Sequence, residues 1–212
     1  MQLEQDGRWF SHEIKEAPRN AIRGRNLAWE LPIAAATGAL IAAGDSPASR
    51  EIQSPSLQRQ AGRWSNIGLG LALGGAGAAY ALGCAKHRDS LRAAGQLALE
   101  AAGAATIMGE FLKFATNRQR PNVGNSSGEY WEGGRSFPSG HASASFAIAS
   151  ALAHSSWQAR HRWLKWGIYG LAVGVSLSRY PAKQHFFSDI LVGGTLGYVT
   201  GASLASPHEA VR

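Results

Sequence analysis

The chain has 212 residues, of which 45% are hydrophobic and 17% are charged, and its formal net charge is +7 at pH 7. The charged share lies below the ~25% of soluble domains, and the length fits one domain. The positive charge suits contact with phosphates or anionic lipid. Its spread over several short loops disfavours a nucleic-acid-binding protein, and the single Cys84 excludes an intramolecular disulfide and a cysteine-based metal cluster.

The first 27 residues are polar and basic and contain no apolar run. A cleavable secretory signal peptide needs such a run, so we expect none here. We interpret residues 1–27 as a cytoplasmic tail or a helix on the membrane surface. Residues 28–206 then form one domain, and residues 207–212 are a short C-terminal tail.

Six apolar stretches follow, each bounded by charged residues, proline or clusters of Ser and Asn. Most approach the ~17–25 residues that a membrane-spanning helix needs, whereas the fourth and fifth are short, so we expect parts of their flanks to be helical too. The sequence thus predicts an all-α fold, a bundle of six transmembrane helices. The stretches are residues 27–44, 66–84, 94–115, 141–156, 164–179 and 187–205.

Glycine is frequent in these stretches, which suits close packing of helices in lipid better than a helix in water. Gly197 and Gly201 have the GxxxG spacing, although a glycine-rich segment contains that spacing by chance. A soluble helical bundle remains the alternative, because the mean hydropathy is only −0.16 and Glu100 and Glu110 fall within a proposed span. Glu110 precedes Lys113 by three residues and can pair with it on one helical face.

Charge also predicts an orientation for the six spans. Both termini then lie on one side with twelve basic residues, while the other side has nine, of which three are better explained by chemistry. The positive-inside rule places the termini in the cytoplasm. A long loop at 45–65 and another at 116–138 would face outward.

Three segments with polar side chains meet on that outward face. In the first, Lys113 and Arg120 are seven residues apart, which is two helical turns, and Pro121 predicts that the helix ends nearby. Arginine can bind a phosphoryl group through two hydrogen bonds and lysine acts as a point charge, so the pair suits a dianionic phosphate. A basic helix end at a membrane surface would have the same appearance.

The second segment, Pro138-Ser139-Gly140-His141, opens the fourth apolar stretch. Pro138 suits a helix start, whose free N–H groups and positive dipole end favour an anion. Ser139 adds a hydroxyl, Gly140 exposes its amide, and His141 adds a titratable imidazole. The alternative is an ordinary helix start with a surface histidine.

The third segment joins the fifth and sixth stretches. Arg179 ends the fifth stretch, and His185 and Asp189 lie one helical turn apart at the start of the sixth. Asp189 can accept a hydrogen bond from one imidazole nitrogen of His185, which leaves the other nitrogen a free nucleophile. A metal site also uses such spacing, but the surrounding cations disfavour a divalent ion, so we expect no metal and no cofactor.

Together, Lys113-x6-Arg120-Pro121, Pro138-Ser139-Gly140-His141 and Ser178-Arg179-x5-His185-x3-Asp189 resemble the three-part signature of the type 2 phosphatidic acid phosphatase superfamily. All signature positions match in order between residues 113 and 189, and the six-span layout extends the resemblance over most of the chain. The first 27 residues and the loop 45–65 lie outside the motif.

The resemblance implies a metal-independent membrane phosphatase. It implies that His185 attacks phosphorus to form a phosphohistidine, that Asp189 orients His185, and that His141 protonates the leaving oxygen and then activates water. The phosphoryl oxygens would be bound by Lys113, Arg120, Ser139, the amide of Gly140, and Arg179.

The predicted substrate is a membrane lipid phosphate, a mono- or diester of the pyrophosphate type. Phosphatidic acid, phosphatidylglycerol phosphate and polyprenyl diphosphate all fit, and the predicted location is the cell inner membrane, with the site facing the periplasm or the outside. A lipid phosphotransferase is the nearest alternative. A vanadate-binding haloperoxidase fits the membrane spans and small size poorly, and a non-catalytic transporter or scaffold has no need of His141, His185 and Asp189. The sequence predicts no oligomeric state.

Overall fold

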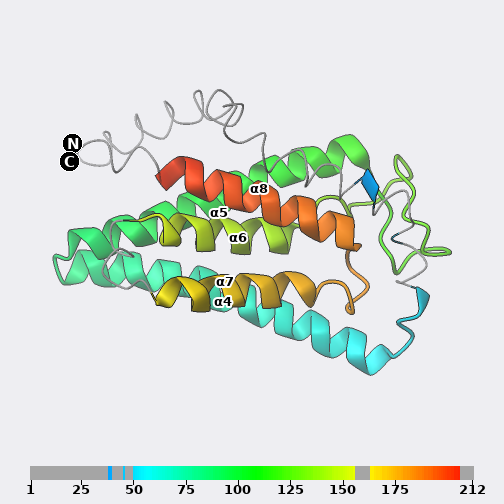
Figure 1. Ribbon diagram of the computed structural model, residues 1–212, viewed down its shortest axis with the longest axis horizontal. Helices are drawn as coiled ribbons and strands as arrows, with labels where there is room; N and C mark the ends of the chain where they lie inside the picture. The colour runs from blue at the N-terminus through cyan, green and yellow to red at the C-terminus, as the bar shows by residue number, and fades with distance from the viewer. Residues whose placement is uncertain (1–37, 40–44, 46–49, 156–162, 206–212) are drawn as a thin grey trace.

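The structure is a computed structural model that describes residues 38, 39, 45, 50–155 and 163–205. Over these residues the chain folds into long helices without a strand, and the helices run back and forth along one axis (Figure 1). They are α4 (Pro55–Ala85), α5 (Asp89–Thr116), α6 (Gly140–Ala153), α7 (Leu164–Leu177) and α8 (Phe187–Ala205). The predicted all-α fold is therefore confirmed for the described part of the chain.

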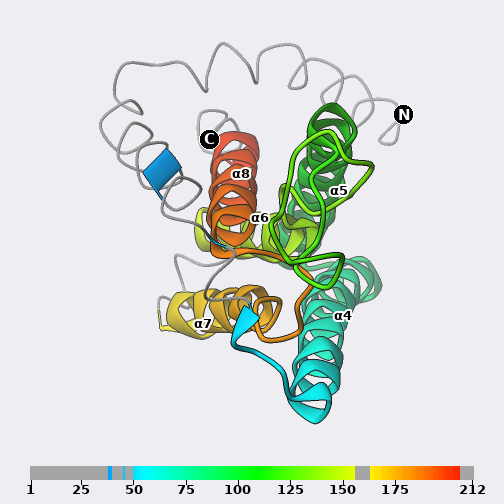
Figure 2. The ribbon, with the colours of Figure 1, turned by 90° about the vertical axis from the view of Figure 1, so that its right-hand side faces the viewer.

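Helix α6 lies at the centre of the bundle and packs against α4, α5, α7 and α8, as the end-on view shows (Figure 2). Most of its side chains are small and buried, and Ala142, Ala147, Ala149 and Ala151 have no exposed surface. Small side chains allow the neighbouring backbones to approach α6 closely.

The closest approach is between α6 and α8. Gly193, Gly197 and Gly201 recur every fourth residue on α8, so they lie on one face of that helix. A Cβ atom at these glycines would meet the carbonyl oxygens of Ser139, Ser143 and Ala147 of α6 well inside van der Waals contact. The GxxxG spacing of Gly197 and Gly201 therefore marks a true helix–helix contact.

Large apolar side chains show the opposite distribution and point outward. On α5, Ile107, Phe111 and Phe114 are 70%, 71% and 78% exposed, and Trp64 and Leu71 of α4 are exposed to a similar degree. A soluble protein buries such side chains and rarely exposes them as a continuous surface. Small residues inside and large apolar residues outside are typical of a bundle that lies in lipid.

Each of the second to sixth apolar stretches overlaps one of these helices. The first stretch, 27–44, lies almost entirely outside the described residues, so the six-helix count stays a prediction. The expected loop at 45–65 is wrong in its second half, because α4 already begins at Pro55. Ser54 caps this helix by accepting a hydrogen bond from the Leu57 amide, and proline fits the first helical turn.

The expectation of helical flanks around the fourth and fifth stretches is met by one described residue, because α6 begins at Gly140. Most of the segment between the two stretches lies outside the described residues. Helices α6 and α7 have 14 residues each, which is about 21 Å and shorter than a bilayer core of ~30 Å. Ser139 caps the start of α6, and the central position of α6 shields it from lipid. Among the described helices, α4 alone combines the length and hydropathy of a membrane-crossing helix.

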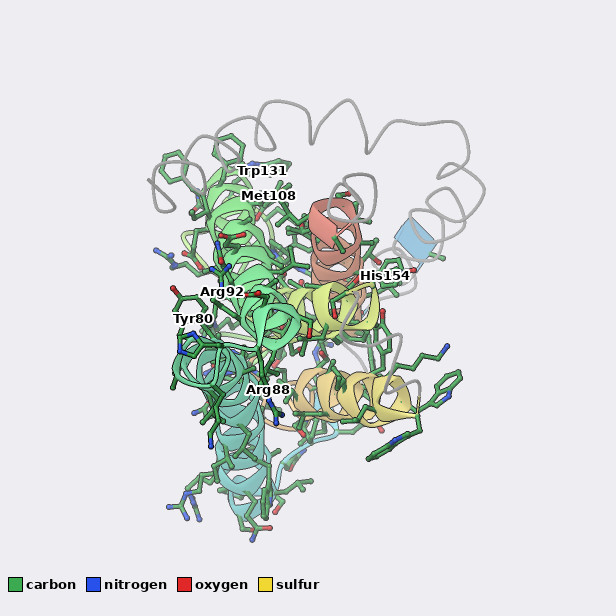
Figure 3. All side chains as sticks on the ribbon, turned by 90° about the vertical axis from the view of Figure 1, so that its left-hand side faces the viewer. Tyr80, Arg88, Arg92, Met108, Trp131 and His154 are labelled. Atoms are coloured by element: carbon green, nitrogen blue, oxygen red, sulfur yellow. The ribbon has the colours of Figure 1, made fainter. Side chains whose placement is uncertain are left out.

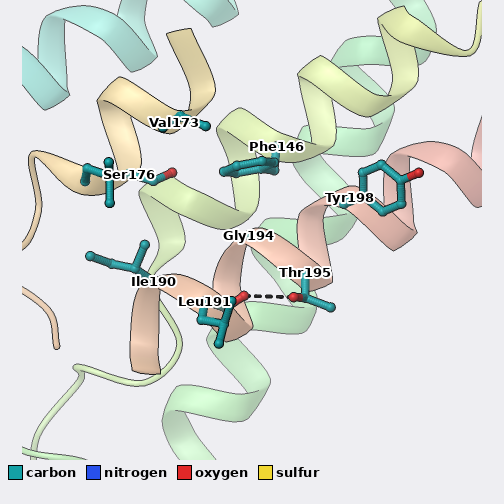
Figure 4. Close-up of a pocket in the computed structure, with 9 residues that line it drawn as sticks. Phe146, Val173, Ser176, Ile190, Leu191, Gly194, Thr195 and Tyr198 are labelled. Carbon is teal, nitrogen blue, oxygen red and sulfur yellow. Dashed lines mark hydrogen bonds between the residues drawn. The ribbon is translucent and has the colours of Figure 1, made fainter. Parts of the chain in front are cut away.

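Helices α7 and α8 both pack on α6 but barely touch each other. An apolar groove of about 430 Å³ lies between them, lined by residues that include Phe146, Leu177, Ile190 and Tyr198 (Figure 4). The hydroxyl of Thr195 in this groove donates to the Leu191 carbonyl 2.9 Å away, so the lining offers almost no free polar group. Such a surface is suited to hydrocarbon.

Candidate active site

The three predicted polar segments meet at one end of the bundle. The C-terminus of α5, the N-terminus of α6 and the turn from α7 to α8 all lie at the loop-rich end, at the right of Figure 1. The alternating direction of the helices produces this convergence, because α5 and α7 run toward that end while α6 and α8 start from it. Segments as far apart in sequence as Lys113 and Asp189 thus form one site.

His185 is 2% exposed, and its Nδ1 atom lies 2.7 Å from the carbonyl oxygen of Ser136. A carbonyl oxygen only accepts hydrogen bonds, so Nδ1 carries the proton and Nε2 keeps its lone pair. Nε2 has no hydrogen-bond partner in the described part of the chain. Burial lowers the pKa of His185, and the carboxylate of Asp189 opposes this effect without reversing it. The imidazole is therefore neutral at pH 7.

The structure corrects the expected hydrogen bond between Asp189 and His185. Oδ2 of Asp189 lies 3.6 Å from Nδ1 of His185, which is too far for a hydrogen bond. Instead, this oxygen accepts from the Ser136 hydroxyl at 2.5 Å and the Phe186 amide at 2.9 Å. The tautomer of His185 is set by the Ser136 carbonyl, and Asp189 acts on the ring as a nearby negative charge.

Arg118 is a buried anchor of Asp189 that the sequence analysis did not identify as part of the site. Its guanidinium donates to Oδ1 of Asp189 at 2.6 Å and forms a second ion pair with Asp45 at 3.1 Å. It also lies over the ring of Phe186, 4.2 Å from the centroid. Arg118 keeps Asp189 ionised in a buried place, where an unpaired carboxylate would be costly.

His141 stands at the first turn of α6, and its Nε2 atom lies 2.9 Å from Oδ1 of Asn66 on α4. The same Oδ1 atom accepts a hydrogen bond from Arg179 at 3.5 Å, so it is an acceptor and the Nε2 atom of His141 donates to it. Asn66 therefore holds the protonated nitrogen of His141 on the side of the site that faces α4.

The start of α6 supplies amide donors. Ser139 is fully buried and caps the helix by accepting from the Ala142 amide, while its own amide donates to the Asp189 carbonyl oxygen at 2.9 Å. The amides of Gly140 and His141 come next, and a helix start gives such groups no acceptor within the helix. The Lys113 ammonium lies directly over Gly140, because a Cβ atom there would be 3.0 Å from Nζ.

Lys113 also pairs with Glu110 at 2.6 Å, as predicted, and the exposed Arg135 contacts the same carboxylate. The other two cations of the motif have no carboxylate partner among the described residues. Arg120 donates to the side-chain oxygen of Gln184, and Arg179 donates to the Ser65 hydroxyl at 2.9 Å.

Arg179 is only 7% exposed, and its Nε atom is buried without a hydrogen-bond partner among the residues that the structure describes. Burial, assisted by the charge of Arg120, lowers the pKa of Arg179 to about 10, which leaves it charged at pH 7. Two such guanidinium groups without a described counter-charge are chemically suited to an anion.

All eight predicted site residues thus lie at this end of the bundle. The site also contains Asn66, Arg118, Ser136 and Gln184, which we did not predict. Arg118 lies two residues before Arg120, and Gln184 directly precedes His185. The motif includes Arg120 and His185 but not these two neighbours, so it did not predict them. Asn66 lies far upstream in sequence, and nothing in the sequence links it to the motif. Among the residues that the structure describes, no three of His, Cys, Asp and Glu gather into a metal site.

The fold and the site together define a class of protein. It is an all-helical bundle that gathers histidine and arginine side chains, suited to an anion, at one end. The chain belongs to the PAP2 superfamily, whose sequence model matches residues 95–210, and the resemblance in the three motifs is thereby confirmed. None of the curated proteins matches the chain.

The fold is similar to the crystal structure of the first transmembrane PAP2 type phosphatidylglycerolphosphate phosphatase from Bacillus subtilis. The TM-score is 0.54, the sequence identity is 22%, and the match covers 96% of each chain. At this identity the similarity shows the fold, and that fold is the one of a transmembrane phosphatase. The family and the fold support a membrane phosphatase.

Proposed function

We propose that this protein is an integral-membrane lipid phosphatase that works through a phosphohistidine on His185 and needs no metal ion. The observation that carries the proposal is the buried, neutral His185, whose free Nε2 atom lies within electrostatic reach of Arg120 and Arg179. A nucleophile beside two cations without a described counter-charge is suited to a phosphoryl group.

In the first half-reaction, the lone pair of His185 Nε2 attacks phosphorus, and the bond from phosphorus to the leaving oxygen breaks. His141 enters this step as an imidazolium and gives one of its two protons to that oxygen, which leaves His141 neutral. The leaving group departs as an alcohol or as a phosphate. Lys113, Arg120, Arg179 and the first amides of α6 hold the equatorial oxygens. Phosphoryl transfer depends mainly on such positioning and charge stabilisation.

In the second half-reaction, water attacks the phosphohistidine. His141 now takes a proton from the water, the phosphorus–nitrogen bond breaks, and inorganic phosphate leaves. While phosphorylated, the ring of His185 is cationic, and the Asp189 carboxylate at 3.6 Å stabilises that charge. Arg118 keeps the carboxylate ionised for this purpose.

The three cations of the motif take the place that magnesium ions hold in many phosphoryl-transfer enzymes. Lys113, Arg120 and Arg179 also repel a divalent ion electrostatically. Charge stabilisation by side chains is the basis for proposing a metal-independent reaction.

The site lies at the extracytoplasmic end of the bundle in this proposal. Figure 3 views the opposite end, where Arg88 and Arg92 stand beside the turn from α4 to α5, and Lys86 belongs to the same turn. Basic residues in short connections favour the cytoplasmic side. A lipid in the outer leaflet then reaches the site with its phosphate at the level of the headgroups, and the apolar surface of the helices lies in hydrocarbon.

The test is phosphate release by purified, detergent-solubilised protein with EDTA present. Phosphatidic acid, phosphatidylglycerol phosphate and a polyprenyl diphosphate are offered in parallel. We expect release by the wild type and none by His185→Ala. His154→Ala is the matched control, because Nδ1 of His154 also lies 2.8 Å from a backbone carbonyl but at the other end of the bundle.

Activity that EDTA abolishes would contradict the metal-free mechanism. Equal release by His185→Ala and the wild type would contradict the nucleophile. Turnover that needs an added alcohol acceptor and yields a new phosphate ester in place of inorganic phosphate would identify the protein as a phosphotransferase.

A further inference from the structure

A second basic region adjoins the site on the side of α4. A cavity of about 520 Å³ lies between the first half of α4, the loop after α5 and the turn from α7 to α8. Its polar lining includes Arg59, Arg63, Asn66, Asn122, Arg179 and Gln184. Figure 2 looks onto this end of the bundle, with the start of α4 and the turn before α8 in front.

The cavity is continuous with the phosphoryl site. Arg179 and Asn66 line it, and both are joined by the hydrogen bond from Arg179 to the Asn66 side-chain oxygen. Asn66 also accepts the proton of His141 Nε2, so the proton donor of the reaction points toward the cavity. When the leaving oxygen replaces Asn66 as the partner of His141, the leaving group extends into the cavity that Asn66 lines.

The cavity carries more positive charge than one phosphoryl group requires. Arg59 and Arg63 are four residues apart on α4, so they share one face of the helix. Neither pairs with a carboxylate among the described residues, whereas Arg92 pairs with Asp89 at the other end. Beside them, the Nε atom of the buried Arg179 has no hydrogen-bond partner in the described part of the chain. The charge of Arg59 and Arg63 is available to a second anionic group.

We infer that Arg59 and Arg63 bind a second phosphate, carried by the leaving group, and so select lipids with two phosphates over phosphatidic acid. The inference rests on the proposed phosphatase function of the site. The leaving group of a lipid diphosphate is a lipid monophosphate. The leaving group of phosphatidylglycerol phosphate is phosphatidylglycerol, which carries a phosphodiester. The leaving group of phosphatidic acid is diacylglycerol, which is neutral and has no anionic group for these arginines to bind.

The experiment compares the wild type with the double variant Arg59→Gln/Arg63→Gln on phosphatidic acid, phosphatidylglycerol phosphate and a polyprenyl diphosphate. The control is Arg88→Gln/Arg92→Gln, which removes the same charge at the same spacing from the opposite end. We expect kcat/KM to fall by about tenfold or more for the lipids with two phosphates. Phosphatidic acid and the control variant should change by less than about threefold, within the effect of exposed charges.

An equal fall for phosphatidic acid would overturn the inference, because it would show general attraction of anionic lipid. Unchanged rates for all lipids, or the same fall in the control, would also overturn it. The two lipids with two phosphates differ in their leaving groups. If kcat/KM falls for only one of them, the cavity binds the leaving group of that lipid. If the wild type turned over none of the three lipids, that result would instead count against the proposed function.

A binding measurement covers the case of slow turnover. In the His185→Ala background, which blocks transfer to the protein, we expect inorganic pyrophosphate to bind more tightly than inorganic phosphate. Arg59→Gln/Arg63→Gln should remove that difference and leave phosphate binding nearly unchanged. Equal binding of the two probes before the arginines are changed would overturn the inference.

Discussion

At the scale of single residues, the site keeps its central histidine neutral while gathering positive charge around it. The Ser136 carbonyl fixes the proton on Nδ1, and burial disfavours a second proton on the ring. Arg120 and Arg179 add to this effect through their charge. The same cations that we propose bind a phosphoryl group therefore also help to keep the lone pair of His185 free.

This arrangement predicts how His185 titrates. Its pKa should lie below the ordinary value of 6.5, because burial outweighs the attraction of Asp189 for the imidazolium. Asp189→Asn should lower the pKa further, since it removes the group that raises it. NMR titration of isotope-labelled histidine in detergent micelles, assigned with His185→Ala, measures both values.

The direction of the shift also has a consequence for stability. The unfolded chain binds a proton at His185 before the folded protein does, so this residue makes the fold less stable as the pH falls below 6.5. A titration midpoint at or above 6.5 in the wild type, or a rise in Asp189→Asn, would contradict this account of the site.

The sequence predicted the residues of the site better than their contacts. Spacing placed His185 and Asp189 one helical turn apart, and they are neighbours in the fold. Spacing could not show that Ser136, Phe186 and Arg118 occupy the carboxylate oxygens, because that depends on the path of the loop before α6. The partner of His141 was equally beyond prediction, since Asn66 comes from another helix.

At the scale of the helices, the contact between α6 and α8 positions the groups to which we assign catalysis. Gly193, Gly197 and Gly201 bring the two backbones together. At the end of this contact, the Ser139 amide donates to the Asp189 carbonyl oxygen, which joins the start of α6 to the start of α8. His141 and His185 therefore keep their relative places through the packing of two helices.

Gly197→Ala tests this contact. A Cβ atom at residue 197 would overlap the backbone of α6 at Ser143, and overpacking of this kind costs roughly 1–3 kcal/mol. We expect a lower melting temperature in detergent and a reduced rate of phosphate release. Gly74→Ala is the control, because nothing lies within 4 Å of its Cβ position on α4, and alanine favours a helix. Equal melting temperatures for the two variants would contradict the role of the α6–α8 contact.

Helix positions were largely predictable because apolar stretches and their polar boundaries mark where a helix lies. The start of α4 was missed, since its first turns are polar and basic and resemble a loop. Those turns carry Arg59 and Arg63 and line the cavity beside the site. The polar start of α4 therefore lies beside the candidate active site.

At the scale of the whole molecule, the distribution of side chains matches the proposed environment. Small residues fill the interior, large apolar residues cover the outside of α4 and α5, and the charged site occupies one end. A lipid phosphate can reach such a site from the plane of the membrane, while water reaches it from the end of the bundle. Both reactants of the proposed lipid phosphatase can thus reach the end of the bundle at which the buried His185 lies.

The covalent phosphohistidine is the central claim, and trapping it is the most direct test. His141→Gln removes the group that activates water, and an aryl phosphate supplies a leaving group that departs without a proton from His141. The mass of the protein is measured after rapid quenching in alkali, with His141→Gln/His185→Asn as the control.

We predict that His141→Gln gains the mass of one phosphoryl group, on His185, and that the control gains none. Steady release of phosphate by the wild type without any such gain in His141→Gln, or a gain that persists in the control, would contradict the mechanism.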